Sequence, residues 1–108
     1  SRKITGIFQP HLYTRTRDFV NEFAIALSVL DEVLLLDIYP ARELSLEGVT
    51  SEWLLNKIKS SSKKVVSKSE AIRKATTDSN EIILTMGAGD IDQIVEPIKI
   101  AIDERYGN

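Results

Sequence analysis

The chain has 108 residues, the size of one ordinary domain with a single hydrophobic core. Hydrophobic residues make up 43% and charged residues 28%, a composition typical of globular proteins and not of disordered or fibrous ones. The formal net charge of −2 excludes a long-range attraction to nucleic acid or to an anionic membrane, and the lack of cysteine excludes disulfides, thiolate catalysis and zinc–thiolate sites.

The start of the chain is unusual for a complete protein. Residue 1 is Ser1, the only methionine is Met86, and an apolar run begins almost at once at Ile4. We therefore expect this domain to be part of a longer protein. No apolar run approaches the roughly 20 residues that a membrane span requires, and the lack of cysteine is typical of a reducing cytoplasm.

The first half of the chain predicts a strand, a helix and a second strand. Residues 4–8 form a short β-prone run that Pro10 ends. Thr14 or Thr16 can cap a helix that has Asp18 in its first turn. The buried face of that helix is expected to carry Phe19, Val20, Phe23, Ala24, Leu27 and Leu30. The run 33–39 is almost continuously apolar, as in a strand covered on both faces of a parallel sheet.

The second half continues the alternation. Residues 40–49 are expected to form a surface loop, followed by a helix from about Thr50, a minimal strand at 65–66, a helix over 69–76 and a strand over 81–86. A last helix over 91–102 has Pro97 inside it or near a break. The order βαβαβαβα predicts an α/β fold, an open and mostly parallel, Rossmann-like sheet with helices on both faces.

In such a sheet the turns that leave the carboxyl ends of the strands share one edge, where ligands bind. Here these turns are 9–15, 37–43 and 87–90. The first turn leads into a helix whose free N–H groups favour anions, and arginine adds bidentate recognition of a carboxylate or phosphate. The candidate ligand-binding residues are His11, Tyr13, Arg15 and Arg17, with Asp37, Tyr39, Gly87, Gly89 and Asp90 at the same edge.

Simpler interpretations of these residues stay open. Both arginines suit a solvated helix surface, and a lone histidine is more often a loop hydrogen-bonding residue than a catalyst. The Gly87–Gly89 turn lacks the third glycine of a dinucleotide fingerprint, because position 92 is Asp92, and it equally suits a tight turn capped by Asp90. The chain has no GxxxxGK[ST] phosphate loop, and its single histidine has no second histidine or cysteine to share a metal.

Three stretches nevertheless resemble a known family. FQPHLYTRTRDF (8–19), LLLDIYPARE (34–43) and LTMGAGDI (84–91), in this order and spacing, closely resemble the C-terminal domain of the UDP-N-acetylmuramate–L-alanine ligases of the Mur ligase family. The resemblance spans essentially the whole chain. The first stretch is specific to these ligases, whereas the GlyAlaGly turn is shared more loosely.

The resemblance implies a cytoplasmic, three-domain enzyme of peptidoglycan synthesis, of which residues 1–108 form the last domain. The UDP-sugar domain and the domain that binds ATP and Mg²⁺ would lie outside this chain, as would the catalytic residues. The C-terminal domain would close over the site and help to seat L-alanine, with His11 and Arg15 on the amino-acid side and Tyr13 and Arg17 as supports.

One position departs from the family pattern, because many members have arginine directly after the histidine where this chain has Leu12. Two alternatives stay open beside the alanine-adding ligase. One is a stand-alone anion- or nucleotide-binding α/β module without catalysis, and the other is a related ligase that attaches a preformed tripeptide. Neither nucleic acid nor a membrane is expected as a partner.

Overall fold

The protein is described by a computed structural model for residues 3–77, 82–87 and 97–100. Its centre is a four-stranded sheet in the order β3–β2–β1–β4, and all the neighbouring strands are parallel. The strands are β1 (Ile4–Gln9), β2 (Glu32–Leu35), β3 (Lys63–Val65) and β4 (Ile82–Gly87). This parallel sheet confirms the predicted fold class, and β1 lies in its interior, between β2 and β4.

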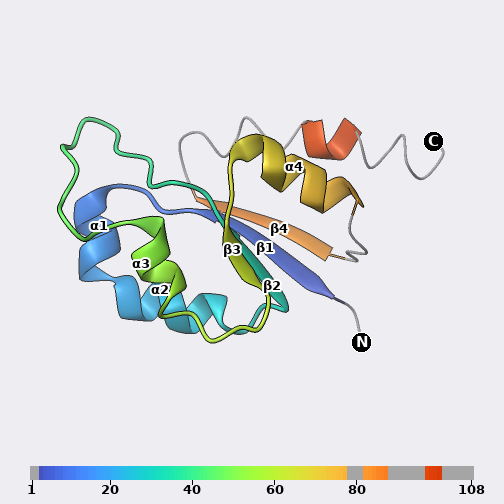
Figure 1. Ribbon diagram of the computed structural model, residues 1–108, viewed down its shortest axis with the longest axis horizontal. Coiled ribbons are helices and arrows are strands. Elements are labelled where there is room, and N and C mark those ends of the chain that lie inside the picture. Colours follow the sequence, from blue (N-terminus) through green and yellow to red (C-terminus); the bar gives the residue numbers. More distant parts are fainter. Residues whose placement is uncertain (1–2, 78–81, 88–96, 101–108) are drawn as a thin grey trace.

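Helices cover both faces of the sheet (Figure 1). One face carries α2 (Val20–Leu27) and α3 (Ser51–Leu55), and the other carries α4 (Lys68–Thr77) and the helical residues 97–100. The short helix α1 (Tyr13–Asp18) lies at one end of the sheet. No helix within the described ranges is long and apolar enough to cross a membrane.

Each face of the sheet has its own hydrophobic cluster, because successive residues of a strand point to opposite sides. In β2, Val33 and Leu35 pack toward α2 and α3, whereas Leu34 packs toward α4, and all are buried. Ile98 joins the α4 side. The apolar run in this strand is therefore explained by burial on both faces of the sheet, as its pattern predicted.

Gly6, in the middle of β1, lies close to the side chains of Leu30 and Met86. A Cβ at Gly6 would collide with the Leu30 side chain and would come within 3.0 Å of Met86 Cε. Leu30 follows α2 and packs onto its cluster. The absence of a side chain at Gly6 is therefore a packing requirement and not a loop signal.

Several predicted boundaries are wrong. The single helix expected from Thr14 or Thr16 onward is two helices, because Phe19, with φ −117° and ψ 20°, interrupts it, and Phe19 is 48% exposed instead of buried. The strand expected at 33–39 spans Glu32–Leu35, because the chain leaves the sheet near exposed Asp37. The last helix was expected over 91–102, and only residues 97–100 of it lie within the described residues.

A buried carboxylate, Glu32, begins β2 at the amino end of the sheet and was not anticipated from the sequence. Its oxygens accept hydrogen bonds from the Thr5 and Ser62 hydroxyls at 3.2 and 3.3 Å, and Lys3 Nζ lies 3.5 Å away. A charge in this position needs such partners because burial removes its water. These contacts are far from the ligand edge and fasten β1, β2 and the loop before β3 together.

Candidate functional site

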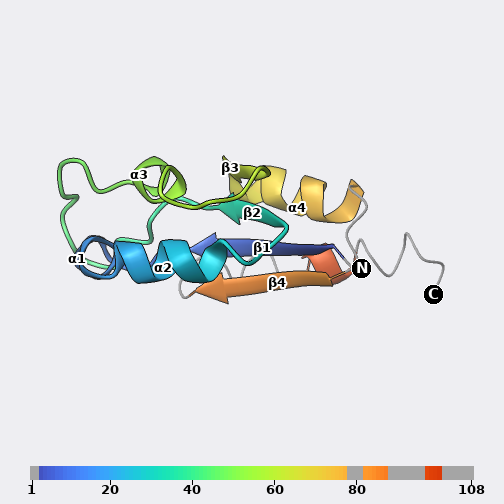
Figure 2. The ribbon, with the colours of Figure 1, turned by 90° about the horizontal axis from the view of Figure 1, so that it is seen from below.

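The carboxyl ends of β1 and β4 meet at one end of the molecule, beside α1 and the loop 40–49 (Figure 2). Gln9 pairs with Gly87 at the end of the sheet, and His11 forms an isolated parallel bridge with Tyr39. The turns after β1 and β2 therefore converge beside the carboxyl end of β4, as the topology predicted. Of the last turn, Gly89 and Asp90 lie outside the described residues.

The turns after β1 and β2 form one hydrogen-bonded unit. The Leu12 N–H donates to the Tyr39 carbonyl at 2.8 Å, and the Tyr39 N–H donates to the Pro10 carbonyl at 2.8 Å. The His11 and Tyr39 rings stack with centroids 5.6 Å apart and 13° between their planes. This stack fixes the plane of the imidazole, so Tyr39 supports His11 directly.

His11 and Arg15 share a cavity of about 230 Å³. Its remaining lining comes from Phe8, Gln9, Phe23 and Gly87. The Phe8 and Phe23 rings lie 5.4 Å apart and form an apolar part of the cavity lining, which also includes Arg15 and His11. This combination suits a small molecule that carries a carboxylate and little else, because arginine binds a carboxylate through two parallel hydrogen bonds.

The other two residues of the predicted quartet lie elsewhere. Tyr13 lines a separate cavity of about 350 Å³, together with Asp37 and the start of α3. Arg17 pairs with its neighbour Asp18, with Nε 2.8 Å from Oδ1, and Asp18 raises the pKa of Arg17. The structure thus brings His11 and Arg15 together and separates Tyr13 and Arg17 from them.

Sequence reasoning missed Glu43, a residue of the loop 40–49 whose carboxylate contacts the start of α1. Its Oε1 accepts hydrogen bonds from the Tyr13 and Thr14 N–H groups at 2.6 and 3.2 Å, and its Oε2 accepts one from the Thr14 hydroxyl at 2.6 Å. The protein's own carboxylate therefore occupies the position where the helix start was expected to attract an anion. The only signal in the sequence was the acidic end of LLLDIYPARE.

The predicted caps of this helix are accordingly wrong. Leu12, the residue before α1, makes no side-chain capping hydrogen bond, and the Thr14 hydroxyl donates to Glu43 instead of capping the helix. The Thr16 hydroxyl is buried and donates to the Leu12 carbonyl at 2.8 Å. Asp18 is the last residue of α1, so it does not lie in the first turn.

We expect the contribution of Glu43 to stability to depend on pH. The hydrogen bond from the Thr14 hydroxyl, with those from the Thr14 and Tyr13 N–H groups, lowers the pKa of Glu43. A lowered folded-state pKa gives stability that is fully present above the unfolded value of about 4.3 and is lost as the pH falls through the folded value. Urea unfolding of the wild-type chain and of Glu43→Gln should therefore give a constant stability difference from pH 7 to about 5.5, which shrinks toward pH 3.

The variant carries no titratable group at position 43, so the change in this difference reports Glu43 alone. A difference that stays constant down to pH 3, or that grows on acidification, would contradict the three hydrogen bonds as the cause.

Among the described residues, Gly87 is the one further edge candidate that lines the cavity of His11 and Arg15. Its φ of 125° is a conformation that residues with a side chain rarely adopt, and a Cβ would stand 2.5 Å from the Gln9 carbonyl oxygen.

Asp37 is exposed, and its backbone carbonyl accepts a hydrogen bond from Gln9 Nε2 at 3.3 Å. Among the described residues, no group of three or more His, Asp or Glu side chains could hold a metal ion.

Together these features define a parallel α/β domain in which one arginine and one stacked histidine line the same cavity at the ligand edge. No protein-family model matches the chain. The chain is 51% identical over 106 residues to the UDP-N-acetylmuramate–L-alanine ligase of Cytophaga hutchinsonii, covering 98% of this chain and 23% of that protein. The ligase of the same name from Porphyromonas gingivalis is 54% identical over 101 residues, covering 92% of this chain and 22% of the ligase.

A third relative with that name, from Parabacteroides distasonis, is 53% identical over 98 residues, covering 91% of this chain and 21% of the ligase. The chain is therefore homologous to a segment of UDP-N-acetylmuramate–L-alanine ligases, at about 50% identity. It spans about a quarter of the length of the curated relatives that it matches.

Proposed function

We propose that residues 1–108 are the C-terminal domain of a three-domain, ATP-dependent UDP-N-acetylmuramate–L-alanine ligase. The observation that carries this proposal is about 50% identity across 98% of the chain to ligases of that name, of which it covers 23%. A stand-alone binding module has no comparable support. In this proposal the N-terminal and central domains of the same polypeptide are the domain's partners, and the enzyme acts in the cytoplasm.

The reaction forms one amide and releases phosphate. The lactyl carboxylate of UDP-N-acetylmuramate takes the terminal phosphoryl group of ATP, which leaves as ADP. The amine of L-alanine then attacks the acyl phosphate, the C–O bond to phosphate breaks, and the amine loses a proton. ATP and Mg²⁺ are held mainly by the other domains, and the described part of this chain offers no metal-ligating cluster.

The role of this domain is to seat the amino acid. The Arg15 guanidinium binds the carboxylate of L-alanine, and His11 in the same cavity orients the amino acid beside it. The apolar wall of Phe8 and Phe23 faces the methyl group. Tyr13 and Arg17 support these two residues without lining their cavity, and Tyr13 lines the second cavity instead. Because position 12 is leucine where many family members have arginine, Arg15 is the one arginine among the described residues of this cavity that binds the carboxylate.

The edge residues Asp37, Tyr39 and Gly87 belong to the surface that the other domains meet when the enzyme closes, and Gly89 and Asp90 stay predictions for the same edge. Closure of this kind completes a site that neither part has alone. Tyr39 acts through its stack on His11, and Gly87 lines the cavity itself.

Replacing Arg15 tests the proposal in the full-length ligase that carries this chain. Because a hydrogen bond to a charged group contributes about 1.5–3 kcal/mol, Arg15→Ala should raise the Michaelis constant for L-alanine by about 10- to 150-fold. The Michaelis constants for ATP and UDP-N-acetylmuramate should stay within about twofold. Steady-state kinetics with each substrate varied in turn measures all three.

Arg42→Ala is the matched control, since Arg42 is an exposed arginine of the loop 40–49 and lines none of the cavities described above. It should leave all three constants unchanged. An unaltered Michaelis constant for L-alanine in Arg15→Ala would reject the assignment of Arg15, and a wild-type enzyme that forms no amide with L-alanine would reject the proposed function.

A further inference from the structure

The turn that carries His11 and Arg15 has a strained backbone. Leu12, between His11 and α1, has φ 70° and ψ 138°, a conformation that costs free energy for any residue with a side chain. Ala41, two residues before Glu43, has φ 53°. Outside glycine these are the two positive φ values in the described residues, and they lie on the two turns that face each other.

Strain of this kind persists only where surrounding contacts hold it. On one side of Leu12, its N–H donates to the Tyr39 carbonyl at 2.8 Å. On the other side, its carbonyl accepts from the Thr16 N–H at 3.1 Å and from the Thr16 hydroxyl at 2.8 Å. These bonds fix the peptide groups of Leu12, and the two at its carbonyl come from Thr16 within α1 itself.

Glu43 ties the start of α1 to the loop 40–49. It is the one side chain of the loop 40–49 with a hydrogen bond to α1 in the described structure, and it makes three, to the Tyr13 N–H, the Thr14 N–H and the Thr14 hydroxyl. The first turn of α1 is thereby tied to the β2 side of the edge, and Arg15 follows directly after Thr14. Hydrogen bonds to an ionised carboxylate are about twice as strong as neutral ones.

We propose that Glu43 is a positioning residue for amino-acid binding, which holds the strained turn 11–14 so that His11 and Arg15 face the same cavity. This inference rests on the proposed function. Glu43 lines neither the His11–Arg15 cavity nor that of Tyr13, so it acts through α1 and not by touching the substrate.

The test compares Glu43→Ala, Glu43→Asp and Glu43→Gln in the full-length ligase. Alanine removes all three hydrogen bonds, and aspartate is one methylene too short to make them. Glutamine keeps an acceptor oxygen for the two N–H groups. The Michaelis constant for L-alanine should rise about tenfold in the alanine and aspartate variants, equivalent to about 1.4 kcal/mol. The glutamine variant should recover most of this loss, and the constant for ATP should not change.

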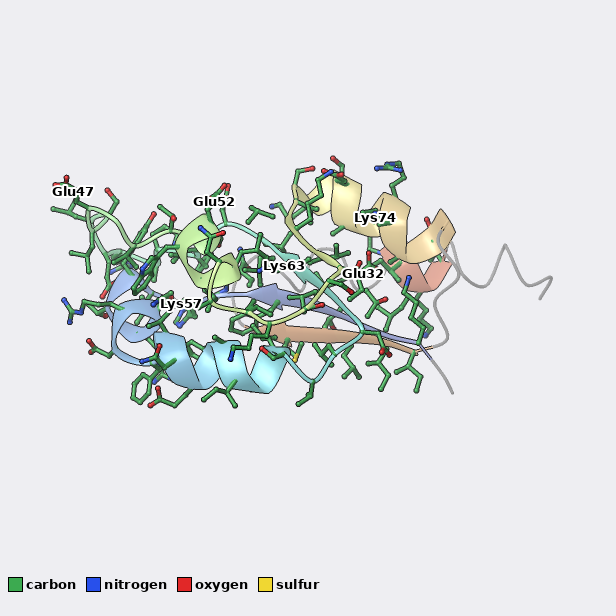
Figure 3. The ribbon with its side chains drawn as sticks, turned by 60° about the horizontal axis from the view of Figure 1, so that its bottom comes forward. Glu32, Glu47, Glu52, Lys57, Lys63 and Lys74 are labelled. Atoms are coloured by element: carbon green, nitrogen blue, oxygen red, sulfur yellow. The ribbon has the colours of Figure 1, made fainter. Side chains whose placement is uncertain are left out.

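A purely structural role would lower the amount of folded enzyme and hence the maximal rate, without a selective change for one substrate. Glu47→Ala is the control, because Glu47 is an exposed carboxylate that projects from the outer end of the same loop (Figure 3). An unchanged constant for L-alanine in Glu43→Ala, or an equal rise in Glu47→Ala, would overturn the inference.

Amide hydrogen exchange separates this inference from the proposed function. In the same full-length protein, the Tyr13 and Thr14 amides should exchange at least about tenfold faster in Glu43→Ala than in wild type. The reason is that these two N–H groups no longer donate to the Glu43 carboxylate, so the start of α1 opens more easily. If the wild-type enzyme does not use L-alanine but these two amides lose protection, the proposed function fails and the positioning role stands. If protection is unchanged, the positioning role fails.

Discussion

Replacing Gly87 by alanine should lower the free energy of unfolding by about 2–4 kcal/mol, because the new side chain meets two obstacles at once. The φ of 125° is unfavourable for alanine, and the Cβ would lie 2.5 Å from the Gln9 carbonyl oxygen, which belongs to the backbone and cannot rotate away. The end of β4 must then separate from β1, so the wall of the His11–Arg15 cavity opens as well. Urea unfolding of the chain measures the loss.

Gly48 provides the matched control for this substitution. Its φ is 79°, but a Cβ there has no heavy atom within 4 Å. Gly48→Ala should therefore cost only the conformational penalty, about 1 kcal/mol after the gain from a less flexible unfolded chain. Equal losses at the two positions would show that the contact with Gln9 contributes nothing and that the strands end differently.

Ile7→Ala should lower the free energy of unfolding by about 3–4 kcal/mol, within the range of large-to-small substitutions in a core. Ile7 is 0% exposed, lies in the interior strand β1, and packs against the cluster beneath α4. Strands on both sides prevent the space from collapsing, so a cavity remains. Urea or thermal unfolding of the chain checks the value.

Ile25→Ala, on the outer face of α2 where Ile25 is 72% exposed, is the control and should change stability by no more than about 0.5 kcal/mol. A loss at Ile7 as small as that at Ile25 would contradict the placement of β1 at the centre of the sheet.

The predictions at the ligand edge share one physical idea. A small substrate with one carboxylate needs few groups, but those groups must be held in place, because binding energy is lost in ordering mobile side chains. In this domain the imidazole of His11 is held by the Tyr39 ring, and the helix of Arg15 is held by Glu43. Both supports come from the turn after β2, so this turn affects the site without lining the cavity.

The family resemblance and the fold were both available from the sequence. FQPHLYTRTRDF, LLLDIYPARE and LTMGAGDI predicted the ligase family that the relatives confirm. The alternation of apolar runs predicted the parallel sheet and its two covered faces. The roles of His11, Tyr13, Arg15 and Arg17 stay predictions, although the structure shows that only the first and third of them share a cavity.

What the sequence by itself determined is the order of strands and helices and the face that each one buries. These properties depend on the spacing of apolar residues within a few turns of chain, so they are encoded locally. The helix break at Phe19 escaped this logic, because the apolar spacing continues through it while the backbone changes direction to place α1 at the edge.

Only the tertiary structure decided which groups meet at the ligand edge. Nothing local to Glu43 indicates that its carboxylate accepts hydrogen bonds from the start of a helix 29 and 30 residues earlier in the chain. The physical reason is that a lone charged side chain has no periodicity. Its partner is chosen by the folded backbone around it, after the hydrophobic faces have brought the turns together.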